Sequence, residues 1–402
     1  MRADADIAIL GAGCAGLSLA TALASRRVPG RVMLLEPRTE YARDRTWCFW
    51  NTEEHLFTSE ISHSWNSWRV SSGGRTALQQ SRRYRYCHIA GDAFYRVAID
   101  RVQREPGQEL SLGTAVHSAE PHASGLVAIE TSAGRLFAKQ VFDSRPPAAG
   151  LSMQAPMLLQ RFVGWHIRTA DPCFAPNTAE LMHFLPSDTP DRTRFLYLLP
   201  FSSTEALVEM TYLDSPSLPE PPYTRDLEAW LREQVGAWEV LYTEQGSLPM
   251  QPASILPSGS LNVHPIGIRG GRIKPSSGYA FLRMQRHSRA IAHALEQGRP
   301  IPTSAEPAFY GWMDAVFLRA LEQSPGAAPD LFLRMFARTE PDALVRFLSE
   351  ASDGPGETLR VAWSLPKLPM IRAAATYPFR TKIAPAKSLA TLASGSESGV
   401  EL

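Results

Sequence analysis

The chain has 402 residues, of which 44% are hydrophobic and 20% charged, and its formal net charge at pH 7 is +1. These values are typical of a globular protein with a sizeable core, and they argue against nucleic acid as a main partner. The four cysteines, Cys14, Cys48, Cys87 and Cys173, lie far apart without a C-x-x-C pair, so we expect neither a metal site nor a disulfide framework, as in a reducing cytosol.

The chain begins with a pattern that predicts a strand, a glycine turn and a helix. Residues 6–10 and 31–36 are apolar runs typical of buried parallel strands, and residues 17–26 have helical spacing. Together they form a β-α-β unit of about 30 residues, which is the context that a dinucleotide-binding glycine motif requires.

That motif, G-x-G-x-x-G, stands between the first strand and the helix. Gly11 permits the tight turn, Gly13 lets the backbone approach a pyrophosphate, and Gly16 lets the helix pack against the strand. Glu36 follows Gly16 by twenty residues, where a carboxylate binds ribose hydroxyls and repels a 2′-phosphate. The motif predicts NAD or FAD in preference to NADP. The expected cofactor contacts here are Gly11, Gly13, Cys14, Ala15, Gly16 and Glu36.

Further elements follow in chain order. We expect a helix at 92–105 and a strand that closes the first nucleotide-binding half at Asp143. Residues 156–211 contain aromatic-rich segments with strand patterns, which indicate an antiparallel sheet. Helices are predicted at 226–240 and 279–297, and amphipathic helices after Pro307.

The stretch IGIRGGRIKPSSGYAF is similar to the second flavin-contacting segment of glutathione-reductase-type FAD proteins, in which a glycine precedes a loop that opens a helix toward the flavin. This favours FAD, and the helix N-terminus favours an anionic reduced ring. A proline-capped helix start is the simpler reading. The Gly-Asp pair common in such enzymes is absent. The residues expected to contact FAD, with Arg45 from the earlier loop, are Arg45, Gly267, Lys274, Pro275, Ser276, Ser277, Gly278 and Tyr279.

The predicted fold class is α/β, a glutathione-reductase-type Rossmann FAD-binding fold with an inserted antiparallel-sheet substrate domain and C-terminal helices. The expected divisions are an FAD-binding domain at 1–150 and 255–300, a substrate-binding sheet at 151–254, a helical region at 301–378 and a flexible tail at 379–402.

Up to about residue 375 the chain resembles the bacterial lycopene β-cyclases. The resemblance rests on the order and spacing of GAGCAG, DRTWCFW, YRYCHI, VFDSRPP, QRFVGWHI, ELMHF, FLYLLPFS, LVEMTYLD, QGSLPM, KPSSGYAF, RFLSE and LPKLPMIRA. It implies an isomerase that converts lycopene through γ-carotene to β-carotene, with FAD kept reduced by NADPH and no net redox change. An acid protonates a terminal double bond, the ring closes on the resulting cation, and a proton is lost.

Glu209 is the expected catalytic acid. It stands in the apolar run Ala206–Thr211, where burial raises a carboxyl pKa, and the resemblance points to the same residue. By composition alone, an outward-facing, solvated Glu is the more common reading. The family typically has two adjacent acids here, but this chain has Met210 in the second position, which puts a mechanism with a carboxyl pair in doubt.

Aromatic side chains and two histidines of the predicted sheet are candidate substrate contacts. Aromatic faces attract a carbocation and exclude water, although core packing would place the same residue types there. His166 and His183 stand where relatives carry acids, either as proton-transfer groups or as neutral replacements. The candidates are Trp165, His166, His183, Phe184, Phe195, Tyr197 and Phe201.

A forty-carbon substrate requires contact with the membrane surface. No run reaches the roughly 18 apolar residues of a spanning helix, so we expect a cytoplasmic protein bound peripherally to the inner membrane. The apolar, basic stretches 307–321 and 329–338 could lie at an interface or equally cover a core.

Other functions are possible on this fold. An FAD monooxygenase or halogenase is disfavoured because the mid-sequence Asp-Gly and the W-x-W-x-I-P motif are absent. A prenyl-chain reductase would add hydrogen to its substrate, and a non-catalytic carotenoid-binding protein would not need Glu209.

Overall fold

The first of two large sheets is built around the N-terminal strand. The structure is a computed structural model that describes residues 2–146, 158–187, 189–251, 262–302 and 308–376. The strand order is β8-β2-β1-β11-β10-β9, with β17 beside β11, and β1 pairs in parallel with both β2 and β11. The strands are β1 (Ala5–Leu10), β2 (Val32–Leu35), β8 (Gln108–Ser111), β9 (Val116–Pro121), β10 (Val127–Thr131), β11 (Gly134–Asp143) and β17 (Val263–Pro265).

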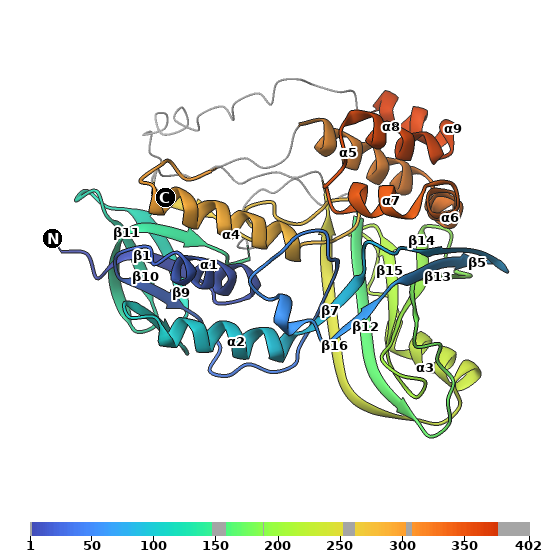
Figure 1. Cartoon of the computed structure of the whole chain (residues 1–402), viewed down its shortest axis with the longest axis horizontal. Helices are drawn as coiled ribbons and strands as arrows, with labels where there is room; N and C mark the ends of the chain where they lie inside the picture. The colour runs from blue at the N-terminus through green and yellow to red at the C-terminus, as the bar shows by residue number, and fades with distance from the viewer. Residues whose placement is uncertain (1, 147–157, 188, 252–261, 303–307, 377–402) are drawn as a thin grey trace, which may run out of the picture.

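Three helices, α1 (Cys14–Ser25), α2 (Gly91–Arg104) and α4 (Phe281–Glu296), pack beside this sheet (Figure 1). Helix α1 contacts both α2 and α4. It lies close to β1 because residue 16 is glycine: a Cβ there would stand 2.0 Å from the carbonyl oxygen of Gly11. The turn at Gly11 and the start of α1 can therefore lie this close only because residue 16 has no side chain.

The second large sheet has the strand order β16-β12-β15-β14-β13-β5-β6. Its strands pair antiparallel except for β5 and β13, which are parallel, and β5 and β6 come from residues 67–80, far upstream of the others. The strands are β5 (Ser67–Ser72), β6 (Arg75–Gln80), β12 (Leu158–Thr169), β13 (Thr178–Leu185), β14 (Arg192–Pro200), β15 (Glu205–Asp214) and β16 (Trp238–Met250).

The helix predicted at 226–240 is shorter than expected. Helix α3 (Tyr223–Gln234) ends before Gly236, whose φ of +87° is a left-handed conformation and whose N–H donates to the Leu231 carbonyl. Such a glycine terminates a helix, and the chain then turns into the long strand β16. The prediction for 235–240 was therefore wrong.

A small three-stranded sheet, β3-β7-β4, lies between the two large sheets, and the last helices of the described chain follow it (Figure 1). Its strands and the associated 3-10 turn are β3 (Thr46–Trp50), η1 (Thr58–Glu60), β4 (His63–Trp65) and β7 (Tyr86–Ala90). The later helices are α5 (Ala308–Gln323), α6 (Ala328–Arg338), α7 (Pro341–Leu348), α8 (Pro355–Ser364) and α9 (Lys367–Thr376), with the 3-10 turn η2 (Pro325–Ala327) before α6.

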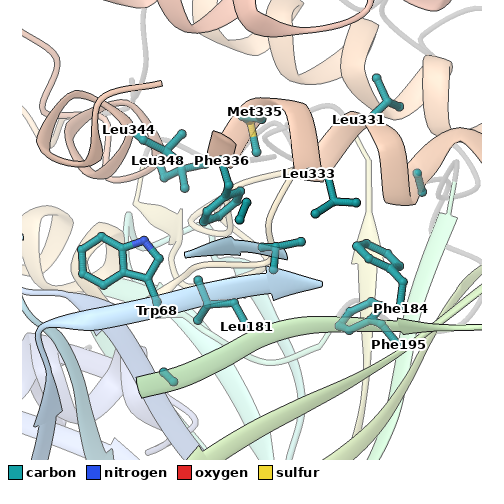
Figure 2. Packing of buried hydrophobic residues seen from close by; sticks show 14 of the residues in the cluster. Trp68, Leu181, Phe184, Phe195, Leu331, Leu333, Met335, Phe336, Leu344 and Leu348 are labelled. Carbon is teal, nitrogen blue, oxygen red and sulfur yellow. The ribbon is translucent and has the colours of Figure 1, made fainter. Parts of the chain in front are cut away.

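The helical region and the second sheet share one apolar core. Figure 2 shows side chains of α6 and α7 above side chains of the sheet. Helix α3 packs on the opposite face, against β12 and β15. The labelled members of this core are Trp68, Leu181, Phe184, Phe195, Leu331, Leu333, Met335, Phe336, Leu344 and Leu348.

The predicted fold class is confirmed: a Rossmann-type nucleotide-binding unit carries an inserted antiparallel sheet and C-terminal helices. The tail predicted at 379–402 lies outside the described residues.

Candidate active site

The glycine motif forms an open helix N-terminus. Gly11 has a φ of +87°, and Gly13 caps α1 without any side-chain hydrogen bond to the helix. A Cβ added to Gly13 would meet no atom within 4 Å, so there is open space in front of the helix. Unsatisfied N–H groups at a helix N-terminus bind phosphate, and the geometry fits a pyrophosphate.

Glu36 lies at the end of β2 beside this motif. Its carboxylate accepts the Ala12 N–H at 2.6 Å and the Arg38 guanidinium at 2.8 Å. Burial alone would raise the pKa of Glu36, but these hydrogen bonds lower it below its ordinary value. Glu36 is therefore an ionised hydrogen-bond acceptor at the end of β2, the place of the ribose-binding carboxylate in dinucleotide-binding units.

The segment around Gly267 lies against the N-terminal glycine motif. Gly267 has a φ of +62°, and a Cβ added to it would stand 2.8 Å from the Cβ of Ala15. The loop that follows, including Ser277, Gly278 and Tyr279, lines the large cavity together with Ser276 and Arg45. The Gly267 segment therefore contacts the glycine motif, and the loop after it reaches the cavity, whereas Gly11, Gly13, Glu36 and Gly267 do not line that cavity.

Lys274 precedes the loop residues that line the cavity, and its side chain points to the C-terminal helices. Its buried Nζ stands 3.0 Å from Asp314 of α5 and 3.4 Å from Glu350, which also pairs with Arg283 of α4. Neither Lys274 nor Pro275 borders the large cavity. The lysine thus joins the loop to the C-terminal helices.

The cavity has a volume of about 460 Å³ and lies between the second sheet, β3 and the C-terminal helices. Apolar and aromatic side chains dominate its lining, as is typical of sites for small hydrophobic ligands. Of the predicted substrate contacts, Phe184, Phe195 and Tyr197 line it.

The other predicted substrate contacts do not line this cavity. Trp165 packs in the apolar layer under α3, and His183 pairs with Ser71 at 2.7 Å. His166 is buried with its Nε2 2.6 Å from Glu205, and its ring stacks on Phe201 at a centroid distance of 4.8 Å.

Glu209 lies on β15 and faces the cavity. Burial raises its pKa well above the ordinary value, and the neighbouring carboxyl of Glu244 raises it further. Met210 points to the opposite face, into the apolar layer under α3, as alternation along a strand requires. The second carboxyl at this site therefore comes from β16.

Glu244 and Tyr86 are site residues that the sequence reasoning did not identify. The Tyr86 hydroxyl lies 2.9 Å from that of Tyr197 and 3.4 Å from that of Tyr279. The three hydroxyls are therefore linked by hydrogen bonds, and all three tyrosines line the cavity. A signal for Glu244 was present on the neighbouring strand: an isolated glycine, Gly164, in a run of bulky residues indicates close approach of other groups.

Comparisons with known proteins find relatives over most of the chain. The family described as "Lycopene cyclase protein" matches residues 6–375. The lycopene beta-cyclase of Pantoea ananas is 27% identical over 297 residues, which cover 70% of this chain and 72% of the relative. Among solved structures, a geranylgeranyl bacteriochlorophyll reductase-like protein from Thermoplasma acidophilum aligns with a TM-score of 0.58 at 12% identity, over 93% of this chain and 96% of that chain.

A second solved structure, halogenase PltM in complex with phloroglucinol and FAD, aligns with a TM-score of 0.57 at 11% identity, over 91% of this chain and 87% of that chain. At these identities the solved structures agree with the fold alone, whereas the family match covers nearly the whole chain. The chain belongs to the lycopene cyclase family.

Proposed function

We propose that this protein is a lycopene β-cyclase that converts lycopene through γ-carotene to β-carotene, using an acid and no net electron transfer. The observation that carries the proposal is a buried carboxyl, Glu209, in a largely apolar cavity that is also lined by the loop at 276–279. The relative from Pantoea ananas has the same activity by name.

Glu209 is the proton donor in this proposal. Its raised pKa favours the protonated carboxyl, which can transfer a proton to a terminal double bond. The neighbouring double bond then attacks the tertiary cation, and loss of a proton leaves the ring alkene. Phe195 and Tyr197 line the cavity, and aromatic rings there would stabilise positive charge and exclude water.

The cofactor we propose is FAD, held by the glycine motif, by Glu36 and by the loop at 276–279. Bound in its reduced form, FAD would place a negative charge beside the cation without transferring hydride. NADPH is the proposed source of the electrons that keep it reduced. PltM, which has the same fold, is described as a complex with FAD.

We also propose that the protein binds the membrane surface through α8 and α9. The structure has no helix among the described residues that is long and apolar enough to cross a bilayer. The two stretches considered from the sequence contribute to α5 and α6, whose apolar side chains are largely in the core. Large apolar side chains on α8 and α9 are exposed instead. They are Leu359 (57% exposed), Trp363 (77%), Leu368 (70%) and Ile371 (63%).

Two further features of α8 and α9 support a lipid partner. Their exposed charged side chains, Arg360, Lys367 and Arg372, are all basic, which suits anionic headgroups. The cavity lining also extends to Lys367, Met370 and Ile371. A hydrocarbon leaving the bilayer at this surface would therefore meet the cavity directly.

The decisive experiment is an anaerobic assay of the FAD-loaded protein with lycopene in liposomes, with the flavin chemically reduced. We expect γ-carotene and then β-carotene, each with the mass of lycopene, while the amount of reduced flavin stays constant. Glu209→Gln should lose turnover and keep its flavin content. A product two hydrogens heavier would show a reductase, and equal activity with oxidised flavin would refute the proposed role of the cofactor.

A further inference from the structure

Two carboxyl side chains from strands that are not adjacent meet in the cavity. Strand β12 lies between β15 and β16, and Gly164 of β12 is directly opposite Glu209 on one side and Glu244 on the other. The two carboxyls lie close enough across the intervening strand for each to affect the pKa of the other, and both glutamates line the cavity.

The absence of a side chain at residue 164 makes this contact possible. A Cβ added to Gly164 would stand 2.7 Å from the Cγ of Glu209 and 3.2 Å from the Cγ of Glu244. Any larger residue would push the two carboxyls apart. Gly164 has no left-handed backbone conformation that would require glycine, so the close approach of the glutamates is the reason for it.

The surroundings of the two carboxyls differ. Thr46 and the positive charges of Arg43 and Arg45, on the segment before and at the start of β3, favour the ionised form of Glu244. Burial raises the pKa of Glu244, and these groups oppose the rise. The other ionisable groups around the pair come from β3, β7, β14, β16 and the 276–279 loop. They are Cys48, Tyr86, Tyr197, Tyr242 and Tyr279.

We propose that Glu244 and Glu209 share one proton, and that Glu244 is a positioning residue that keeps this proton on Glu209 until the substrate takes it. Two adjacent carboxyls in a buried site cannot both ionise easily, and the partner with the more favourable surroundings for a negative charge is the carboxylate. That partner is Glu244, so Glu209 is the acid.

The inference rests on the proposed function and completes its proton balance. Glu209 loses its proton as a new C–H bond forms, which leaves two carboxylates side by side. Such a pair has a strong tendency to regain one proton, so it accepts the proton that the ring carbon loses when the alkene forms. One proton enters the substrate and one leaves, and no electrons are gained or lost.

Glu244→Gln tests the inference directly. Activity requires a protonated Glu209, so the rate falls as the pH rises through the pKa of that carboxyl. Without the Glu244 charge, the alkaline limb of the kcat/KM profile should move to lower pH by about one unit or more. Gly164→Ala should move it in the same direction. Glu239→Gln is the matched control, because Glu239 is exposed on the same strand and should leave the profile unchanged. An unchanged profile for Glu244→Gln would overturn the inference.

An infrared titration without substrate separates this inference from the proposed function. At neutral pH the wild type should show an infrared band from a protonated carboxyl, and Glu209→Gln should lack it. As the pH is raised, the band should disappear at a lower pH in Glu244→Gln than in the wild type. If lycopene is not converted but the band changes as expected in both variants, the shared proton is supported and the proposed substrate is refuted. If lycopene is cyclised and Glu244→Gln does not change the band, the shared proton is refuted.

Discussion

Gly13 and Gly16 stand three residues apart in the same motif, but an added methyl group would have different surroundings at each. At Gly13 it meets no protein atom within 4 Å, whereas at Gly16 it lies 2.0 Å from the Gly11 carbonyl oxygen. The first glycine therefore keeps space free for a ligand, and the second permits the fold. The two roles can be tested separately.

We expect Gly13→Ala to weaken FAD binding at least about tenfold, because its methyl group occupies the space before the helix N-terminus. The unfolding free energy of the cofactor-free protein should fall by no more than about 1 kcal/mol, the cost of a poorer N-cap. Flavin titration and thermal unfolding without cofactor measure the two effects. Gly16→Ala should instead destabilise the cofactor-free protein, and equal FAD affinity of Gly13→Ala and wild type would contradict the proposed cofactor site.

Helices α8 and α9 expose apolar residues for which the folded chain alone gives no reason. Burial in a lipid interface contributes about 1.5–3 kcal/mol for each large apolar side chain. We expect the double variant Trp363→Ser, Leu368→Ser to bind vesicles that contain phosphatidylglycerol about tenfold or more weakly, with unchanged thermal stability because both side chains are exposed.

A matched control is available on β6. Leu78 is 64% exposed there, on the strand face opposite Ala77 and Gln79, and Gln79 bonds to α6, so Leu78→Ser should leave vesicle binding unchanged. Sedimentation with vesicles measures all three proteins. Equal binding of the double variant and wild type would show that another surface faces the membrane.

A buried ion cluster lies between the nucleotide-binding unit and the C-terminal helices. Lys274 follows the Gly267 segment, Arg283 lies on α4, and both pair with Glu350, which follows α7. Glu350 has a φ of +59°, a left-handed conformation in which glycine is usual, so the chain accepts backbone strain to place this carboxylate. The cluster thus connects the nucleotide-binding unit to the helices that cover the cavity.

Glu350→Gln should lower the free energy of unfolding by about 3–5 kcal/mol, because two buried cations lose a charged partner. Burial raises the pKa of Glu350, but Lys274 and Arg283 lower it below its ordinary value. A lowered carboxyl pKa stabilises the folded state above the unfolded-state pKa of about 4.5, and this stability is lost as the pH falls further. The free energy of unfolding, measured in urea, should therefore fall between pH 7 and pH 4 in the wild type. It should fall by less in Glu350→Gln.

Glu322→Gln is the control for this prediction. Glu322 pairs with Arg319 on the surface of α5, so its loss should cost less than about 1 kcal/mol. A similar effect of both substitutions would show that the buried cluster has no special role.

Features that depend on neighbours along the chain could be predicted from the residues alone. The glycine motif, Glu36 and the apolar strand around Glu209 are local patterns, so their elements and the fold class could be predicted. Three other features depend on how distant segments pack: Glu244 lies beside Glu209, Lys274 belongs to an ion cluster, and α8 and α9 carry the exposed apolar surface. Glu244 was missed because it reaches its partner across a third strand. The register of three strands, with glycine between the two acids, is a long-range property that no local pattern contains.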